Sequence, residues 1–315
     1  MESPAPGLPS PSASSRRRWL RQAAGGLAVL PLARFQDPPH RPLNLRFAVK
    51  VGMTPGDLSL EERFRLVRDC GFDGIELDSP NAWTREEVLA AREASGLPVH
   101  GVVDSVHWNQ RLSHPDPEVR ARGVQALRTA IEDAAAYGGD SVLLVPGRVT
   151  GPEETQELVW ERSIEGIRSV LPLARENAVR ILIENVWNGF CYRHDGPSDQ
   201  GAELLRDYID AIPARAEDRD LVGSYFDIGN HRKYGRPEEW IRTLGRRIHK
   251  LDVKDWGREQ GWARIGEGDV DWPRVREAIA AAGLPAGTWA TAEVAGGGRE
   301  RLLDIRARLE RVLRP

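Results

Sequence analysis

The chain has 315 residues, of which 40% are hydrophobic and 29% are charged, so it is long enough to bury a large core without disulfide support. These values fit one globular domain of the α/β-barrel size class. The formal net charge of −3, with no basic stripe along the sequence, argues against nucleic acid as the main partner. Cys70 and Cys191 lack zinc-finger spacing, and we interpret them as packing thiols.

Residues 1–33 differ in composition from the rest of the chain. An arginine-rich run over 16–21 precedes an apolar stretch over 23–33 that is too short to span a bilayer. The paired arginines, followed by Trp19 and a leucine, resemble the twin-arginine export signal. The resemblance implies the twin-arginine translocase as a partner and a periplasmic location, free or tethered by an uncleaved signal. The alternative is a disordered basic tail, and residues 34–45 are interpreted as a linker.

From residue 46 to 315, short apolar runs typical of strands alternate with helical patterns. The runs cover residues 47–51, 74–77, 99–103, 141–145, 180–183, 221–226, 248–253 and 288–294. Between them, amphipathic stretches cover residues 60–70, 119–137, 160–176, 238–244 and 272–282. Gly71, Gly138 and Gly283 stand where left-handed helix caps are expected.

Eight strands that alternate with helices predict a single-domain α/β fold, the (β/α)8 TIM barrel. Successive runs begin roughly 25–42 residues apart, which is the length of a strand with its crossover helix. A doubly wound open sheet is the alternative, but no glycine-rich phosphate loop follows the first strand.

Four acids lie at or near the ends of four successive runs: Glu184, Asp227, Asp252 and Glu293. In a parallel barrel the carboxyl ends of the strands meet at one mouth, so we expect these side chains to converge. Like charges at close range need a cation to remain ionised. The pattern therefore predicts a divalent-metal site.

Strand alternation places Lys250, Asp252 and Lys254 on one face of the seventh strand. Leu251 and Val253 share the other face, which belongs against the helices. The two lysines and Asp252 are therefore predicted to point into the barrel.

Several motifs resemble those of the sugar phosphate isomerase/epimerase family of xylose isomerase-like TIM barrels, which includes L-xylulose-5-phosphate and ketose 3-epimerases. The segments are CGFDGIEL (70–77), IENVWN (183–188), FDIGN (226–230), DVKD (252–255), GEGDVDW (266–272) and TAEV (291–294). Together they extend over most of the chain after residue 46. The resemblance implies a metal-dependent enzyme that transfers a proton beside a carbonyl through an enediolate.

The same resemblance implies a metal held by glutamate, aspartate, histidine and glutamate on strands five to eight. Glu184, Asp227 and Glu293 match three of these positions, and Asp252 stands where the family has histidine. Glu184 and Glu293 are also the expected catalytic acid and base. An all-oxygen ligand set would favour Mn²⁺ or Mg²⁺ over Zn²⁺ or Co²⁺.

Two interpretations of Asp252 remain open. It is a fourth metal ligand, which leaves a formal charge of −2 around a divalent ion, or it is paired with Lys250 or Lys254 in a site without metal.

Five residues are predicted to bind substrate. They are His107, Glu157, Trp187, His231 and Lys254. Of these, His107 and Glu157 match family positions that contact sugar hydroxyls or the distal end of the sugar.

The leading hypothesis is an exported metal-dependent isomerase or epimerase of a small, unphosphorylated sugar or keto-sugar. A β-eliminating lyase of 3-keto-glycosides, or an inosose dehydratase-like enzyme, would use the same site. A different class is a non-catalytic carbohydrate-binding barrel that has lost the metal. The endonuclease branch of this superfamily requires a dense set of histidines, whereas this chain has 7 scattered ones. Whether the chain forms a homo-oligomer is left open.

Overall fold

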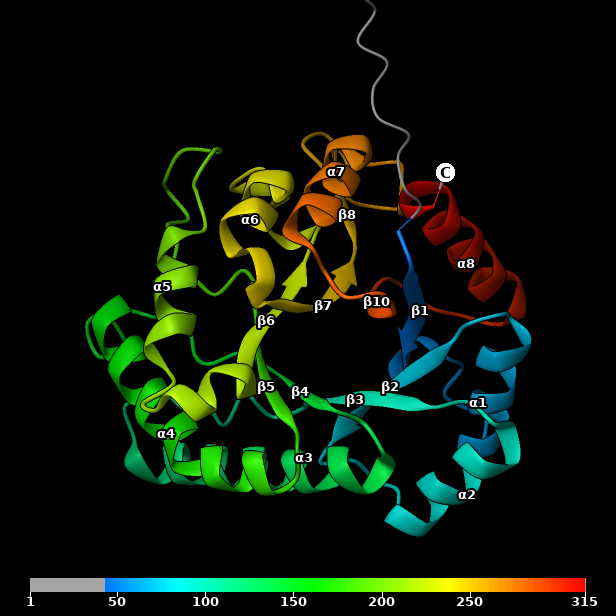
Figure 1. Ribbon diagram of the computed structural model, residues 1–315, viewed down its shortest axis with the longest axis horizontal. Helices are drawn as coiled ribbons and strands as arrows, with labels where there is room; N and C mark the ends of the chain where they lie inside the picture. Colours follow the sequence, from blue (N-terminus) through cyan, green and yellow to red (C-terminus); the bar gives the residue numbers. More distant parts are fainter. Residues whose placement is uncertain (1–42, 315) are drawn as a thin grey trace, which may run out of the picture. The chain divides into compact units, whose positions relative to one another are not determined.

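The computed structural model describes residues 43–314, in which eight parallel strands close into a barrel surrounded by helices (Figure 1). The barrel strands are β1 Leu45–Lys50, β2 Gly74–Ser79, β3 Val99–Asp104, β4 Ser141–Leu144, β5 Arg180–Glu184, β6 Val222–Asp227, β7 Ile248–Val253 and β10 Thr288–Ala292. The predicted (β/α)8 barrel is confirmed. The proposed signal over 1–33 and most of the linker over 34–45 lie outside the described residues.

Barrel closure depends on the pairing of the first strand with the last. Neighbours follow the order β1-β10-β7-β6-β5-β4-β3-β2, and Leu45 lies in register with Thr288. This pairing excludes the open doubly wound sheet, which would leave β1 and β10 apart. All eight barrel strands run in parallel, so their carboxyl ends form a single mouth.

The helices that cover the barrel begin and end at the expected kinds of residue. They are α1 Leu60–Asp69, α2 Arg85–Ser95, α3 Pro117–Tyr137, α4 Gln156–Glu176, α5 Glu203–Ala211, α6 Pro237–Leu244, α7 Trp272–Ala282 and α8 Arg299–Leu313. Ser59 with Glu62 forms a capping box at the start of α1. Gly138 and Gly283 end α3 and α7 in the left-handed conformation, as predicted. None of the described helices has an apolar stretch long enough to cross a bilayer.

A small hairpin stands between β7 and α7, where no strand was predicted. It consists of β8 Asp255–Gly257 and β9 Gly261–Ala263, which pair antiparallel with Trp256 opposite Trp262. Strands of three residues are too short to show a period in the sequence. Short 3-10 helices occupy Val51–Met53, Ala216–Leu221, Asn230–Lys233 and Gly245–Arg247.

The main apolar core lies between the sheet and the helices, and a smaller one fills the barrel. Inside the barrel, Leu143, Leu182 and Tyr225 pack together below the mouth. The Tyr225 hydroxyl lies 2.8 Å from Thr291 Oγ1, which is 3.2 Å from His100 Nε2. This packed interior closes the floor of the site.

Candidate metal and active site

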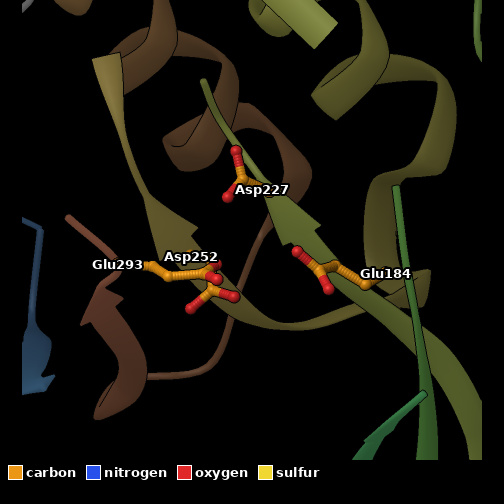
Figure 2. Close-up of side chains that lie close together, drawn as sticks. All are labelled: Glu184, Asp227, Asp252 and Glu293. Carbon is orange, nitrogen blue, oxygen red and sulfur yellow. The ribbon is translucent and has the colours of Figure 1, made fainter. Parts of the chain in front are cut away.

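The four predicted acids converge at the mouth of the barrel and form what we term the carboxylate centre, Glu184, Asp227, Asp252 and Glu293. Glu184 and Asp227 end β5 and β6, Asp252 lies one residue before the end of β7, and Glu293 directly follows β10. One ligand oxygen from each lies within 4.8 Å of the others. Because β10, β7, β6 and β5 are consecutive neighbours, the two glutamates flank the two aspartates (Figure 2).

The carboxylate centre is closed on one side and accessible on the other. Asp227 and Asp252 are fully buried, whereas the side chain of Glu293 is 33% exposed. Solvent therefore reaches the centre past Glu293.

Two asparagines from the recognised motifs hold the acids in place. Asn185 exchanges two hydrogen bonds of 2.8 Å with the backbone of Asp227, donating from Nδ2 and accepting at Oδ1. The backbone N–H of Asn230 donates to Asp227 Oδ1 at 2.6 Å, and Asn230 Nδ2 donates to Glu184 Oε1 at 3.3 Å. The IENVWN and FDIGN segments thus form one hydrogen-bonded unit.

Two lysines enter the carboxylate centre. Lys254 Nζ lies 2.9 Å from Glu293 Oε2 and 3.3 Å from Asp227 Oδ2. Lys50 Nζ, at the end of β1, lies 3.0 Å from Asp252 Oδ2 and 3.8 Å from Glu293 Oε2. It also pairs with Glu76 Oε2 at 3.0 Å.

The lysine partner of Asp252 is therefore not one of the two that were predicted. Lys50 was not among the predicted residues, although it is a charged residue at the end of an apolar run. Lys250 points into the barrel as predicted, but its Nζ pairs with Asp140 Oδ1 at 2.6 Å and donates to the His100 carbonyl at 2.6 Å. Lys254 contacts Asp227 and Glu293, as given above, and no direct ion pair joins it to Asp252 among the described residues.

Burial and the lysines separate the pKa values of the two glutamates. Burial, and then the charge of Glu293, raise the pKa of Glu184 to about 8. Burial also acts to raise the pKa of Glu293, but the ammonium groups of Lys50 and Lys254 outweigh it and bring that pKa to about 2. Burial raises the pKa of Asp227 to about 6 and that of Asp252 well above its usual range.

The geometry and chemistry of the carboxylate centre fit a divalent cation. The mutual separation of the four oxygens suits ligands that share one ion at about 2.0–2.6 Å. Asp252 Oδ1 is buried and accepts no hydrogen bond from the described residues. With Glu76, five ionised acids and two lysines sum to −3, which a divalent ion would reduce to −1. The nature of the metal stays a prediction.

The structure places three other predicted substrate-binding residues around the carboxylate centre. His107 is buried, and burial together with the charge of Lys50 lowers its pKa to about 3. His231 is also buried, and its ring stacks on Trp240. The His231 Nδ1 atom lies 3.1 Å from Asn185 Nδ2. Trp187 donates through Nε1 to the Asn230 carbonyl.

Glu157 lies elsewhere, in the first turn of α4. It lines a cavity of about 790 Å³ together with Trp160, Cys191 and Leu204. The acids of the carboxylate centre do not line this cavity, and no hydrogen bond or ion pair within residues 43–314 joins Glu157 to them. Its predicted contact with sugar remains a prediction that this placement does not support.

A closed barrel with a carboxylate centre at its mouth defines the class of protein. The chain belongs to the xylose isomerase-like TIM barrel family, whose model matches residues 64–312. This confirms the broader part of the resemblance seen in the sequence.

Two curated proteins to which the chain is similar belong to different enzyme classes. A probable endonuclease 4 from Symbiobacterium thermophilum is 28% identical over 218 residues, which cover 63% of this chain and 71% of that protein. The L-ribulose-5-phosphate 3-epimerase UlaE from Shigella flexneri is 29% identical over 134 residues, which cover 39% of this chain and 47% of the epimerase. The matched region thus spans about half the length of that epimerase.

Solved structures share the fold along almost their whole length. The 3-keto-D-glucoside 4-epimerase YcjR from E. coli has a TM-score of 0.66 at 17% identity, covering 85% of this chain and 98% of its own. A D-psicose 3-epimerase crystallised in the presence of D-fructose has a TM-score of 0.67 at 15% identity, and the match covers 85% of this chain and 99% of that protein. The IolI protein, which holds a zinc atom, has a TM-score of 0.69 at 14% identity, and the match covers 85% of this chain and 98% of that protein.

Proposed function

We propose that the chain is a divalent-metal-dependent sugar isomerase or epimerase that transfers a proton at the carbon beside a carbonyl. The observation that carries this proposal is the position of Glu184 and Glu293 at the two ends of the carboxylate centre, with their carboxylates directed toward each other (Figure 2). Two facing carboxylates can remove a proton from one side of a carbon and return one from the other side.

The residues have separate roles in this proposal. Asp227 and Asp252, with the two glutamates, would hold the ion. When bound, a divalent cation acts as a Lewis acid that stabilises negative charge developing on a carbonyl oxygen. Lys50 and Lys254, 3.8 Å and 2.9 Å from Glu293 Oε2, keep that carboxylate ionised, which a base requires. Asn230 orients Glu184 through its hydrogen bond to Oε1.

The favoured substrate is a small, unphosphorylated sugar or keto-sugar. Even with a divalent ion, the formal charge of the centre together with Glu76 and the two lysines is −1, which disfavours a phosphate group nearby. The structural relatives that act on psicose and on a keto-glucoside support a sugar substrate. Export of the protein, expected from residues 1–33, stays part of the proposal.

The likeness to an endonuclease does not change the proposal. The metal-capable group found within residues 43–314 consists of four carboxylates and contains no histidine. A dense histidine set, as expected for the endonuclease branch, is absent from it.

A non-catalytic carbohydrate-binding barrel is a second candidate, and the lysines are the observation that favours it. Lys50 and Lys254 already supply two positive charges to the acids. If the two ammonium groups replaced the metal, the centre would bind sugars by hydrogen bonding without proton transfer.

Solvent-deuterium exchange separates these functions. Ketoses and 3-keto-glycosides are incubated in D₂O with the protein, with and without Mn²⁺, and deuterium at the carbon beside the carbonyl is followed by NMR. Metal-dependent exchange that is lost in Glu293→Gln supports the proposal, and the product spectrum distinguishes epimerisation, isomerisation and β-elimination. Binding without exchange of any sugar would support the second candidate instead.

A further inference from the structure

We propose that the exposed indole of Trp262 forms a second sugar-binding position at the barrel mouth, which selects glycosides over free monosaccharides. This inference rests on the proposed function, since it assumes that the carboxylate centre receives one sugar ring. It extends that function by assigning the substrate class and a residue that determines it.

Trp262 is the first reason for this inference. It lies in the middle of β9 and is 52% exposed. Its indole stacks on that of Trp187, with ring centroids 4.9 Å apart and planes inclined by 22°. A large aromatic surface left open to water beside an active site is typical of a ligand-binding surface.

The position of Trp262 relative to the acids is the second reason. Lys254 Nζ lies 5.5 Å from the Trp262 ring centroid and 2.9 Å from Glu293 Oε2. One ammonium group therefore separates the indole from the carboxylate centre. A ring stacked on Trp262 would lie beside the ring held by Glu184 and Glu293, and not in its place. Two neighbouring rings correspond to a disaccharide or another glycoside.

The chemistry of this surface suits a pyranose. The electron-rich face of an indole attracts the partly positive C–H groups on the apolar face of a sugar ring. Ammonium groups near such a face can donate hydrogen bonds to the ring hydroxyls, and Lys233 Nζ lies 4.8 Å from the Trp187 ring centroid. Trp187 covers one face of the Trp262 indole, so the part of Trp262 that stays exposed offers the apolar contact, with hydrogen-bond donors close by.

The hairpin that carries Trp262 is anchored at its base. The buried carboxylate of Asp255 accepts hydrogen bonds from the Trp256 backbone N–H at 2.9 Å, the Gly266 N–H at 2.8 Å and Trp272 Nε1 at 3.0 Å. Trp262 faces Trp256 across the hairpin. Such anchoring reduces the conformational entropy lost when a ligand binds.

Equilibrium binding tests the inference without turnover. Cellobiose, maltose, trehalose and glucose are titrated into the wild type, Trp262→Ala and Trp262→Phe by calorimetry in the presence of Mn²⁺. We expect at least one disaccharide to bind at least tenfold more tightly than glucose to the wild type. Trp262→Ala should lose this preference with glucose affinity unchanged, and Trp262→Phe should keep most of it.

Leu303→Ala provides the control, because Leu303 is a 43% exposed apolar side chain on α8. It should leave every affinity unchanged. Equal binding of glucose and all disaccharides, or a preference that survives in Trp262→Ala, would overturn the inference while leaving proton exchange on monosaccharides intact. Conversely, a Trp262-dependent preference without any proton exchange would retain this subsite and reject the enzyme.

Discussion

The ammonium group of Lys50 lies 3.0 Å from Asp252 Oδ2, joining the end of β1 to the end of β7 across β10. The pair balances the charge of Asp252, the acid that stands where the resemblance implies a histidine. Asp252 therefore has a protein partner on one oxygen, while Oδ1 accepts no hydrogen bond from the described residues. A lysine partner on Oδ2 leaves Oδ1 available to a metal ion, so the observed pair with Lys50 is compatible with Asp252 as a metal ligand.

Replacing Lys50 by methionine should destabilise the metal-free protein. The change leaves Asp252 and Glu76 buried without their shared cation, at a cost of about 1–3 kcal/mol in the free energy of unfolding. Urea unfolding in the presence of EDTA measures this loss. Added Mn²⁺ should raise the melting temperature more in Lys50→Met than in the wild type, since the ion supplies the missing positive charge.

The double variant Lys50→Met, Asp252→Asn is the matched control for this prediction. It removes both charges and should recover part of the lost stability, as expected for two residues in direct contact. If the effects of the two substitutions on the free energy of unfolding are additive, the Lys50–Asp252 contact does not contribute to stability.

Lys250 should prove structural and unconnected to metal binding. Its ammonium is buried between Asp140 and the His100 carbonyl, away from the carboxylate centre. Lys250→Ala leaves a cavity in the barrel, with an expected loss of about 2–5 kcal/mol in unfolding free energy, while the half-exposed Asp140 keeps Arg180 as a partner at 3.6 Å. The methionine of Lys250→Met fills the space, so this variant should lose less unfolding free energy than Lys250→Ala. Metal stoichiometry measured on Lys250→Met should equal that of the wild type, and a reduced stoichiometry would place Lys250 in the metal site after all.

Asp104, at the end of β3, should make stability depend on pH. Burial raises the pKa of its carboxyl from the usual 3.8 to about 7. The folded state thus keeps a proton that the unfolded state has lost, so this group's contribution to stability falls as the pH rises from about 4 to about 7. Asp104→Asn cannot ionise, and its stability relative to the wild type should increase by up to about 4 kcal/mol over this range. Parallel pH profiles for the two proteins, measured by urea unfolding, would refute the assignment.

Much of the site could be predicted because each acid ends its own βα unit. Glu184, Asp227 and Glu293 follow apolar runs, and parallel barrel closure necessarily brings strand ends to one mouth. The separation of Lys250 from Asp252 could not be predicted, although both share one face of β7. Two residues along a strand span almost 7 Å, which moves Lys250 below the mouth.

Lys50 and Trp262 could not be found from the pattern used for the acids. Lys50 ends a run that is more than 130 residues before Glu184, and only the pairing of β1 with β10 brings it to Asp252 and Glu293. Trp262 lies in a hairpin whose strands have three residues each, so neither alternation nor length marks it. The one available signal was a lysine at the end of the apolar segment FAV of the first strand.

The metal content of the purified protein tests the central claim most directly. The protein is loaded with Mn²⁺, dialysed, and analysed by mass spectrometry beside Asp227→Asn, whose backbone hydrogen bonds with Asn185 are retained. We predict one divalent ion per chain in the wild type and none in Asp227→Asn, with both proteins folded by circular dichroism. A wild-type protein that is folded yet holds no ion would show that Lys50 and Lys254 have taken the place of the metal.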